Sequence, residues 1–170
     1  MSVHNARGMS LVEILIAAGI IGIGLAGLMS VVPMASYGVQ EGAQLSTATL
    51  LTQQGIEQAR RASWMATPAV DCLGLSASST AAPTPTGATC NGSTSVTFPD
   101  EGPSLTPIPG FPQYARITRI TDCAAGPGCT GVVSGAMRLV SVSVTYQPMT
   151  GIGVSSSGKT VTVEWVVAQR

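Results

Sequence analysis

The stretch Arg7-Gly8-Met9-Ser10-Leu11-Val12-Glu13 leads directly into a long apolar segment, and no charged residue occurs from position 14 to position 40. Residues 14–35, at about 1.5 Å each, predict a helix of roughly 33 Å, about the thickness of a bilayer's hydrocarbon core. An ionisable residue at the edge of a spanning helix costs free energy and marks a functional site. Glu13 is therefore expected to have a partner.

The segment before this helix fixes its expected orientation. It contains Arg7 and His4 and no acidic residue, and the next basic residue is Arg60. Positive residues stay on the cytoplasmic side of a membrane. We therefore expect a cytoplasmic N-terminus, with everything after about Tyr37 outside.

Small Gly8, apolar Met9, a hydroxyl residue, two aliphatic residues and Glu13 precede the spanning helix, and this order resembles the signal of type IV prepilins and type II secretion pseudopilins. The resemblance implies that a prepilin peptidase cuts after Gly8 and N-methylates Met9, where most members have Phe. It also implies that Glu13 pairs with the free N-terminal amine of an adjacent subunit. Two opposite charges that are costly to bury singly become tolerable together.

Two features of the apolar helix bear on its partners. The run Ile-Gly-Leu-Ala-Gly-Leu at 23–28 looks like the minor pilins known as pilus modification proteins. Ala18, Gly22 and Ala26 are spaced four apart, which would let neighbouring helices approach closely, although small residues are common in any spanning helix.

Beyond the membrane the helix is expected to continue as an amphipathic helix to about residue 66, since Pro68 follows. Leu51 interrupts its polar face, and Pro33 with the glycines at 38 and 42 favours a bend or a partly melted turn near 33–42. The face expected to be buried recurs at helical spacing: Leu45, Ala48, Thr52, Gly55, Ile56, Ala59, Ser63 and Ala66.

Residues 67–113 are rich in Ser, Thr, Ala, Pro and Gly, which predicts a loop region with one short strand at 95–98. An even number of cysteines outside the membrane indicates disulfides. Four cysteines allow three connectivities, of which we favour the sequential one, and a zinc site is the alternative. That alternative is weakened because no Cys-x-x-Cys pair occurs and the only histidine, His4, lies in the leader. The favoured pairs are Cys72 with Cys90 and Cys123 with Cys129.

The last third of the chain predicts β-structure. Apolar and hydroxyl residues alternate in 139–146 and again in 161–167, with a less regular strand at 114–121 and a Gly- and Ser-rich hairpin loop between Met149 and Lys159. Three antiparallel strands packed on the helix would form a small core. The expected fold class is α+β and pilin-like, with a long N-terminal helix packed on a small antiparallel sheet.

The expected domain organisation is a leader at 1–8, a transmembrane and assembly helix at 9–37, and an extracytoplasmic pilin-like domain at 38–170. Within that domain the helix runs to about 66, the loop region covers 67–113 and the sheet covers 114–170. Only 9% of residues are charged and the formal net charge is zero. This balance predicts no strong electrostatic attraction to nucleic acid or anionic lipid.

One catalytic motif needs to be weighed. Residues 153–160 match the phosphate-loop pattern G-x-x-x-x-G-K-[ST], but that loop must open a helix, and here a β-alternating run follows. A hairpin turn is favoured. Without His4 in the mature chain a Ser-His-Asp arrangement cannot form, and Asp100 and Glu101 are interpreted as solvated loop charges. We expect no enzymatic activity, no cofactor and no metal.

The sequence thus favours a minor pilin or pseudopilin, a structural subunit of a type IV pilus or a type II secretion pseudopilus, without distinguishing the two systems. The alternative is a membrane-tethered extracytoplasmic binding module that does not assemble. The partners implied are prepilin peptidase, other pilin or pseudopilin subunits, the inner-membrane assembly platform and the membrane itself. The expected location is the bacterial inner membrane, as a single-pass protein with a periplasmic C-terminal domain, or a filament at the cell surface.

Overall fold

The structure is a computed structural model that describes residues 10–65, 70–86, 90, 97–124, 129–132, 134–150 and 153–169. The chain divides into two compact units, Met1–Gln40 and Glu41–Arg170. One helix, α1 (Leu11–Arg61), contributes residues to both. The units are described separately.

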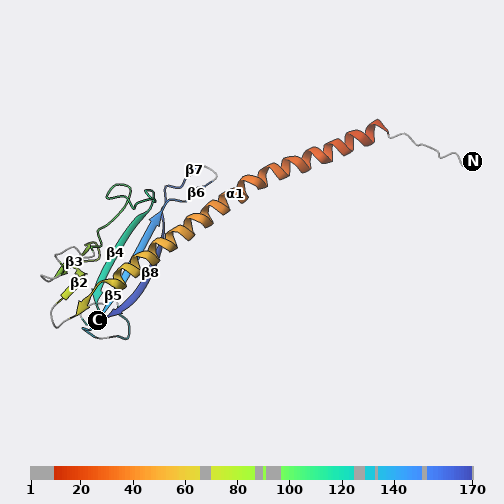
Figure 1. Cartoon of the computed structure of the whole chain (residues 1–170). Coiled ribbons are helices and arrows are strands. Elements are labelled where there is room, and N and C mark those ends of the chain that lie inside the picture. Colours follow the sequence, from red (N-terminus) through yellow and green to blue (C-terminus); the bar gives the residue numbers. More distant parts are fainter. Residues whose placement is uncertain are drawn as a thin grey trace, which may run out of the picture. The chain divides into compact units, whose positions relative to one another are not determined.

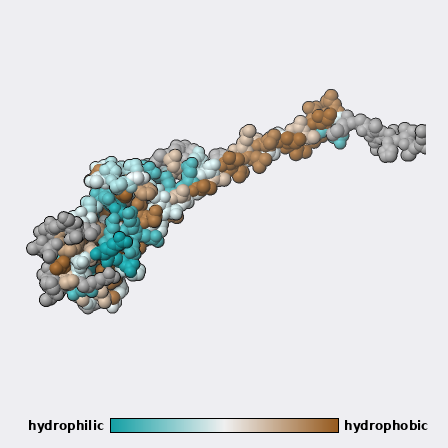
Figure 2. Space-filling view, viewed as in Figure 1, coloured by the Kyte–Doolittle hydropathy of each residue, from teal (hydrophilic) through white to brown (hydrophobic). Residues whose placement is uncertain are grey.

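The first unit consists, in its described part, of Ser10 and the first thirty residues of α1. Ser10 is the N-cap, since its Oγ accepts a hydrogen bond of 3.3 Å from the backbone N–H of Glu13. Hydrophobic residues follow one another along this part of the helix (Figure 2), which is long and apolar enough to cross a membrane. The helix is continuous past Pro33 and Gly42, so the predicted melted turn is wrong. Hydrocarbon offers no water to the N–H and C=O groups of a melted turn. A spanning helix therefore keeps its backbone hydrogen bonds even where it contains proline or glycine.

The second unit is built on an antiparallel sheet of β4 (Ala115–Asp122), β5 (Met137–Tyr146) and β8 (Lys159–Ala168), in that order. Both ladders are regular, without a bulge. The C-terminal part of α1 lies along one face of this sheet (Figure 1). The fold is α+β, as the sequence predicts.

The core lies between α1 and the central strand. Every second residue of β5 faces the helix and is buried, which is the alternation that the sequence shows. A Cβ atom at position 55 would lie only 2.9 Å from Cγ1 of Val142, so Gly55 permits the close approach of helix and sheet. The buried side chains of β5 that belong to the same core clusters as residues of α1 are Val140, Val142, Val144 and Tyr146, and Arg138 is buried on the same side of the strand.

The buried face of α1 differs from the predicted one at several positions. Leu51 is 1% exposed and packs in the core, whereas Leu45 is 48% exposed. The helix ends at Arg61 instead of about 66, because Trp64 and Met65 form strand β1 (Trp64–Met65), and Ser63 consequently lies outside the helix. Ala66 lies outside the described residues.

The predicted loop region contains two strands of a second, three-stranded sheet. Strands β1, β2 (Val70–Ser76) and β3 (Pro83–Thr86) pair antiparallel in the order β1-β2-β3. Of the predicted strand 95–98, residues 95 and 96 lie outside the described part, and Thr97 and Phe98 are not in a strand. Strands β6 (Met149–Thr150) and β7 (Gly153–Val154) form a short ribbon within the predicted hairpin loop.

Candidate functional site

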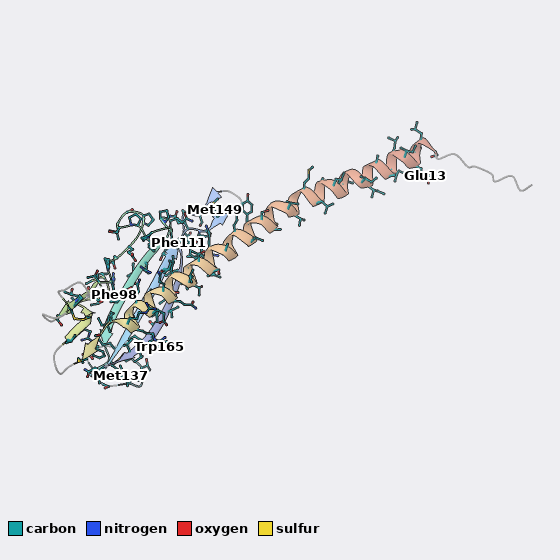
Figure 3. All side chains as sticks on the ribbon, viewed as in Figure 1. Glu13, Phe98, Phe111, Met137, Met149 and Trp165 are labelled. Atoms are coloured by element: carbon teal, nitrogen blue, oxygen red, sulfur yellow. A yellow bond between two sulfur atoms is a disulfide. The ribbon has the colours of Figure 1, made fainter. Side chains whose placement is uncertain are left out.

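The predicted processing site falls at the start of the chain. Gly8 and Met9 lie outside the described residues, and the first described element is the capped start of α1. Glu13 lies in the first turn of that helix, three residues after the N-cap Ser10 (Figure 3). The partial positive charge at a helix N-terminus favours a carboxylate there. Glu13 is exposed, as are the apolar side chains around it, so within this chain the carboxylate is accessible to another group.

The four cysteines form two disulfides. Cys72 is joined to Cys90 and Cys123 to Cys129, with Cα–Cα distances of 5.2 and 5.1 Å. This is the sequential connectivity that the sequence favours. Because every cysteine is bonded to another, none offers a thiolate to zinc.

The interpretation of Asp100 and Glu101 as solvated loop charges is wrong. Both carboxylates form ion pairs with arginines of β4, namely Arg119 with Asp100 at 2.6 Å and Arg116 with Glu101 at 2.6 Å. Arg119 also donates hydrogen bonds to the backbone carbonyls of residues 79 and 80 in the turn between β2 and β3. These pairs attach the irregular segment 97–101 and the small sheet to the main sheet.

A third ion pair joins β2 to β5. Nη1 of Arg138 lies 2.5 Å from Oδ1 of Asp71, and Oδ1 also accepts a hydrogen bond of 2.7 Å from the backbone N–H of Gly74. The guanidinium of Arg138 lies over the ring of Trp64, 4.1 Å from its centroid. Burial by itself raises the pKa of Asp71, but the hydrogen bonds from Arg138 and Gly74 outweigh it and hold that pKa below its usual range.

The phosphate-loop match lies in the loop of a hairpin, as expected. Residues 153–160 run from β7, which pairs with β6, into β8, which pairs with β5, and no helix follows among the described residues. Lys159, which would have to reach a phosphate, instead forms an ion pair with Glu41 of α1. The hydrogen bond to this carboxylate raises the pKa of Lys159.

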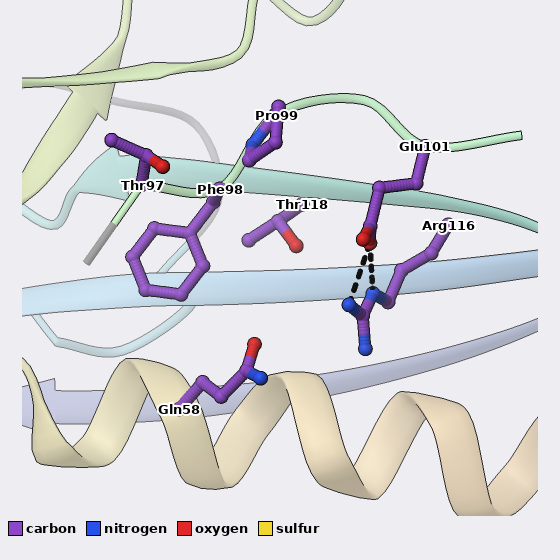
Figure 4. Close-up of a pocket in the computed structure, with 7 residues that line it drawn as sticks. All are labelled: Gln58, Thr97, Phe98, Pro99, Glu101, Arg116 and Thr118. Carbon is purple, nitrogen blue, oxygen red and sulfur yellow. Dashed lines mark hydrogen bonds and ion pairs between the residues drawn. The ribbon is translucent and has the colours of Figure 1, made fainter. Parts of the chain in front are cut away.

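A cavity of about 210 Å³ opens between α1, β4 and the segment 97–101 (Figure 4). The Arg116–Glu101 pair forms one wall. Gln58 of α1 and Thr118 of β4 point their polar groups toward the cavity, and Phe98 forms an apolar wall. The sequence did not predict this site. Arg116 could have indicated it. This charged residue lies four positions before Ile120 in β4, so both side chains are on the face of the strand that packs against the helix.

The comparisons with known proteins concern the start of the chain. Residues 3–29 match the family model described as the prokaryotic N-terminal methylation motif. No curated protein and no solved structure matches the chain. The matched segment contains Gly8, Met9 and Glu13, the residues on which the resemblance to prepilins depends. The motif, together with a long N-terminal helix packed on antiparallel sheets, supports a relationship to type IV pilins and pseudopilins, and the match covers the N-terminal segment of the chain.

Proposed function

We propose that the chain is a minor pilin or pseudopilin that is cleaved after Gly8, N-methylated at Met9 and assembled into a filament through its N-terminal helix. The match of residues 3–29 to the methylation motif carries this proposal. The pilin family is structural and not enzymatic, so the proposed activity is assembly. The domains proposed are the leader 1–8, the assembly helix 9–37 and the extracytoplasmic domain 38–170.

The exposure of the apolar helix supports assembly with other subunits. The large aliphatic side chains described in this part of the helix are more than half exposed, among them Ile20 and Ile23. A Cβ atom at Gly22 would meet no atom within 4 Å, so the line of small residues at 18, 22 and 26 is open to a neighbouring helix. Before assembly the same surface can be covered by lipid of the inner membrane.

The proposed role of Glu13 follows from its position. A carboxylate in the first turn of an apolar helix is costly to place in hydrocarbon without a counter-charge. The free amine of the processed Met9 of an adjacent subunit supplies that charge, and pairing would fix the axial register of the two helices. The inner-membrane assembly platform is the proposed site where this pairing occurs.

The test uses three variants of the full-length chain. Gly8→Val should keep the leader attached, because a branched side chain obstructs the protease. Glu13→Ala should be processed normally, since an apolar span inserts at least as well, yet be missing from sheared surface filaments. Glu57→Ala is the control, because Glu57 lies exposed at the other end of α1 in a pair with Arg60.

Mass spectrometry of the mature N-terminus and immunoblots of sheared filaments give the results. A wild-type N-terminus other than methylated Met9 would overturn the proposed processing. Normal incorporation of Glu13→Ala would overturn the charge-pair mechanism. A wild-type protein that is processed but always stays with the inner membrane would favour the tethered binding module instead.

A further inference from the structure

The cavity between α1, β4 and the segment 97–101 contains hydrogen-bonding groups that the fold itself does not use. Nε and Nη2 of Arg116 both lie 2.6 Å from the same oxygen of Glu101, Oε2. The other carboxylate oxygen, Oε1, has no partner in the described part of the chain. The third guanidinium nitrogen, Nη1, is buried and has no hydrogen-bond partner there. A buried donor without an acceptor is costly, and most such groups in proteins are paired.

Two further groups complete the polar lining. The hydroxyl of Thr118, a residue only 3% exposed, and the side-chain amide of Gln58 make no hydrogen bond to any described residue. In Figure 4 the amide of Gln58 and the free nitrogen of Arg116 face one another across the cavity. The site therefore offers one anionic acceptor, one cationic donor, and two groups that can both donate and accept.

The charges of this lining decide which ligands fit. Arg116 and Glu101 neutralise one another, so an anion would meet the carboxylate and a cation would meet the guanidinium. An uncharged ligand that carries several groups able both to donate and to accept is not opposed by either. Phe98, 5% exposed, provides an apolar wall against which carbon–hydrogen groups can pack.

The size of the cavity limits further which class of ligand can bind. Its volume is about 210 Å³. It is smaller than the pockets of about 300 to 1,000 Å³ that hold drug-sized ligands. A single six-membered ring with hydroxyl substituents matches both the volume and the pattern of donors and acceptors. We propose that this cavity binds one neutral sugar residue.

The test measures binding of four monosaccharides, namely D-glucose, D-galactose, D-mannose and N-acetyl-D-glucosamine, to the full-length protein. Saturation-transfer NMR detects the contact, and titration gives Kd. The protein is kept in a phosphocholine detergent, because maltoside detergents carry sugar headgroups. Saturable binding of at least one sugar by the wild type is expected.

Matched variants locate the binding. Gln58→Leu and Thr118→Val should each raise Kd by about fivefold or more, because each leaves polar groups of the ligand unpaired. Gln54→Leu, the same change one turn earlier at an exposed position, and Thr118→Ser, which keeps the hydroxyl, should leave Kd within about twofold. Thermal unfolding checks that each variant is folded. If Thr118→Val does not fold, the Kd of Gln58→Leu alone tests the location of the sugar, because Gln58 is only half-buried and its replacement should leave the fold intact.

Two results would overturn the proposal. One is the absence of saturable binding of all four sugars by the wild type, which would mean that the cavity holds water. The other is a Kd that Gln58→Leu leaves unchanged, which would place the sugar elsewhere on the protein. Neither result depends on whether the chain assembles into filaments.

Discussion

Replacing Asp71 by asparagine tests how the small sheet is held to the main sheet. The side chains of Arg138 and Asp71 are only 8% and 14% exposed. Asparagine keeps the shape and can still accept the hydrogen bond from the N–H of Gly74, but it leaves the guanidinium of Arg138 without a counter-charge. Removing one partner of a buried ion pair costs about 3–5 kcal/mol.

The expected loss lies at the lower end of that range. Arg138 keeps a hydrogen bond of 3.1 Å to the carbonyl of Gly74 and its contact with the ring of Trp64. We therefore expect Asp71→Asn to lower the free energy of unfolding by about 3 kcal/mol. For a unit of this size each kcal/mol corresponds to a Tm change of about 3–5 °C, so Tm should fall by about 9–15 °C.

The assay is thermal unfolding of the full-length protein, followed by circular dichroism with the disulfides intact. Glu164→Gln is the control, because Glu164 is an exposed carboxylate of β8 without an ion-pair partner among the described residues, and it should change Tm by little. Arg138→Met combined with Asp71→Asn should be more stable than the sum of the single changes predicts, since no charge is then left unpaired. A loss below about 1 kcal/mol for Asp71→Asn, or strict additivity in the double variant, would refute the reasoning.

Three other predictions follow from the same fold. Because the folded-state pKa of Asp71 lies below its ordinary value of 3.8, its contribution to stability is complete above that pH and is lost as the pH falls further. In urea unfolding at pH 2 to 6, the free energy of unfolding of the wild type should therefore fall more steeply with acid than that of Asp71→Asn. Gly55→Val should lower stability by about 2 kcal/mol, since even a Cβ atom would collide with Val142, whereas Gly42→Val, where a Cβ atom meets nothing within 4 Å, should not. Non-reducing peptide mapping should find the two disulfides, and any other pairing would contradict the structure. Removing Cys72–Cys90 should lower the free energy of unfolding by about 1 kcal/mol more than removing Cys123–Cys129, because the first disulfide spans 18 residues and the second spans 6. Equal losses would contradict this expectation.

Local pattern predicts the elements whose structure depends on their own residues. The apolar run after Glu13 is long enough to be a helix whatever surrounds it, and α1 includes the whole of this run. The alternation in 139–146 predicts which side of β5 is buried, because successive side chains of a strand point to opposite faces. The two disulfides follow the chain order, since both link cysteines that are close in sequence.

The same rules fail where a residue's environment comes from distant parts of the chain. Val161, Val163 and Trp165 alternate like the buried residues of β5, yet β8 is an edge strand of the sheet. Trp165 (Figure 3) is 48% exposed, and the guanidinium of Arg60 lies over its ring. Strand alternation shows which residues share a face and not whether that face is fully covered. Leu45 was expected to be buried and Leu51 to be exposed, and the structure shows the reverse. The sheet determines which side of α1 is covered, and the helix sequence does not contain that information.

The sequence by itself determined the processing motif, the long helix and the main strands, because each of these depends on residues that are close together in the chain. Only the tertiary structure decided that β1, β2 and β3 form a second sheet and that Asp71, Asp100 and Glu101 pair with arginines of the main sheet. Such a segment has little apolar periodicity of its own and is ordered by ion pairs and a disulfide. The cavity beside Arg116 was likewise decided by the tertiary structure, since its groups come from a helix, a strand and a loop that no sequence spacing relates.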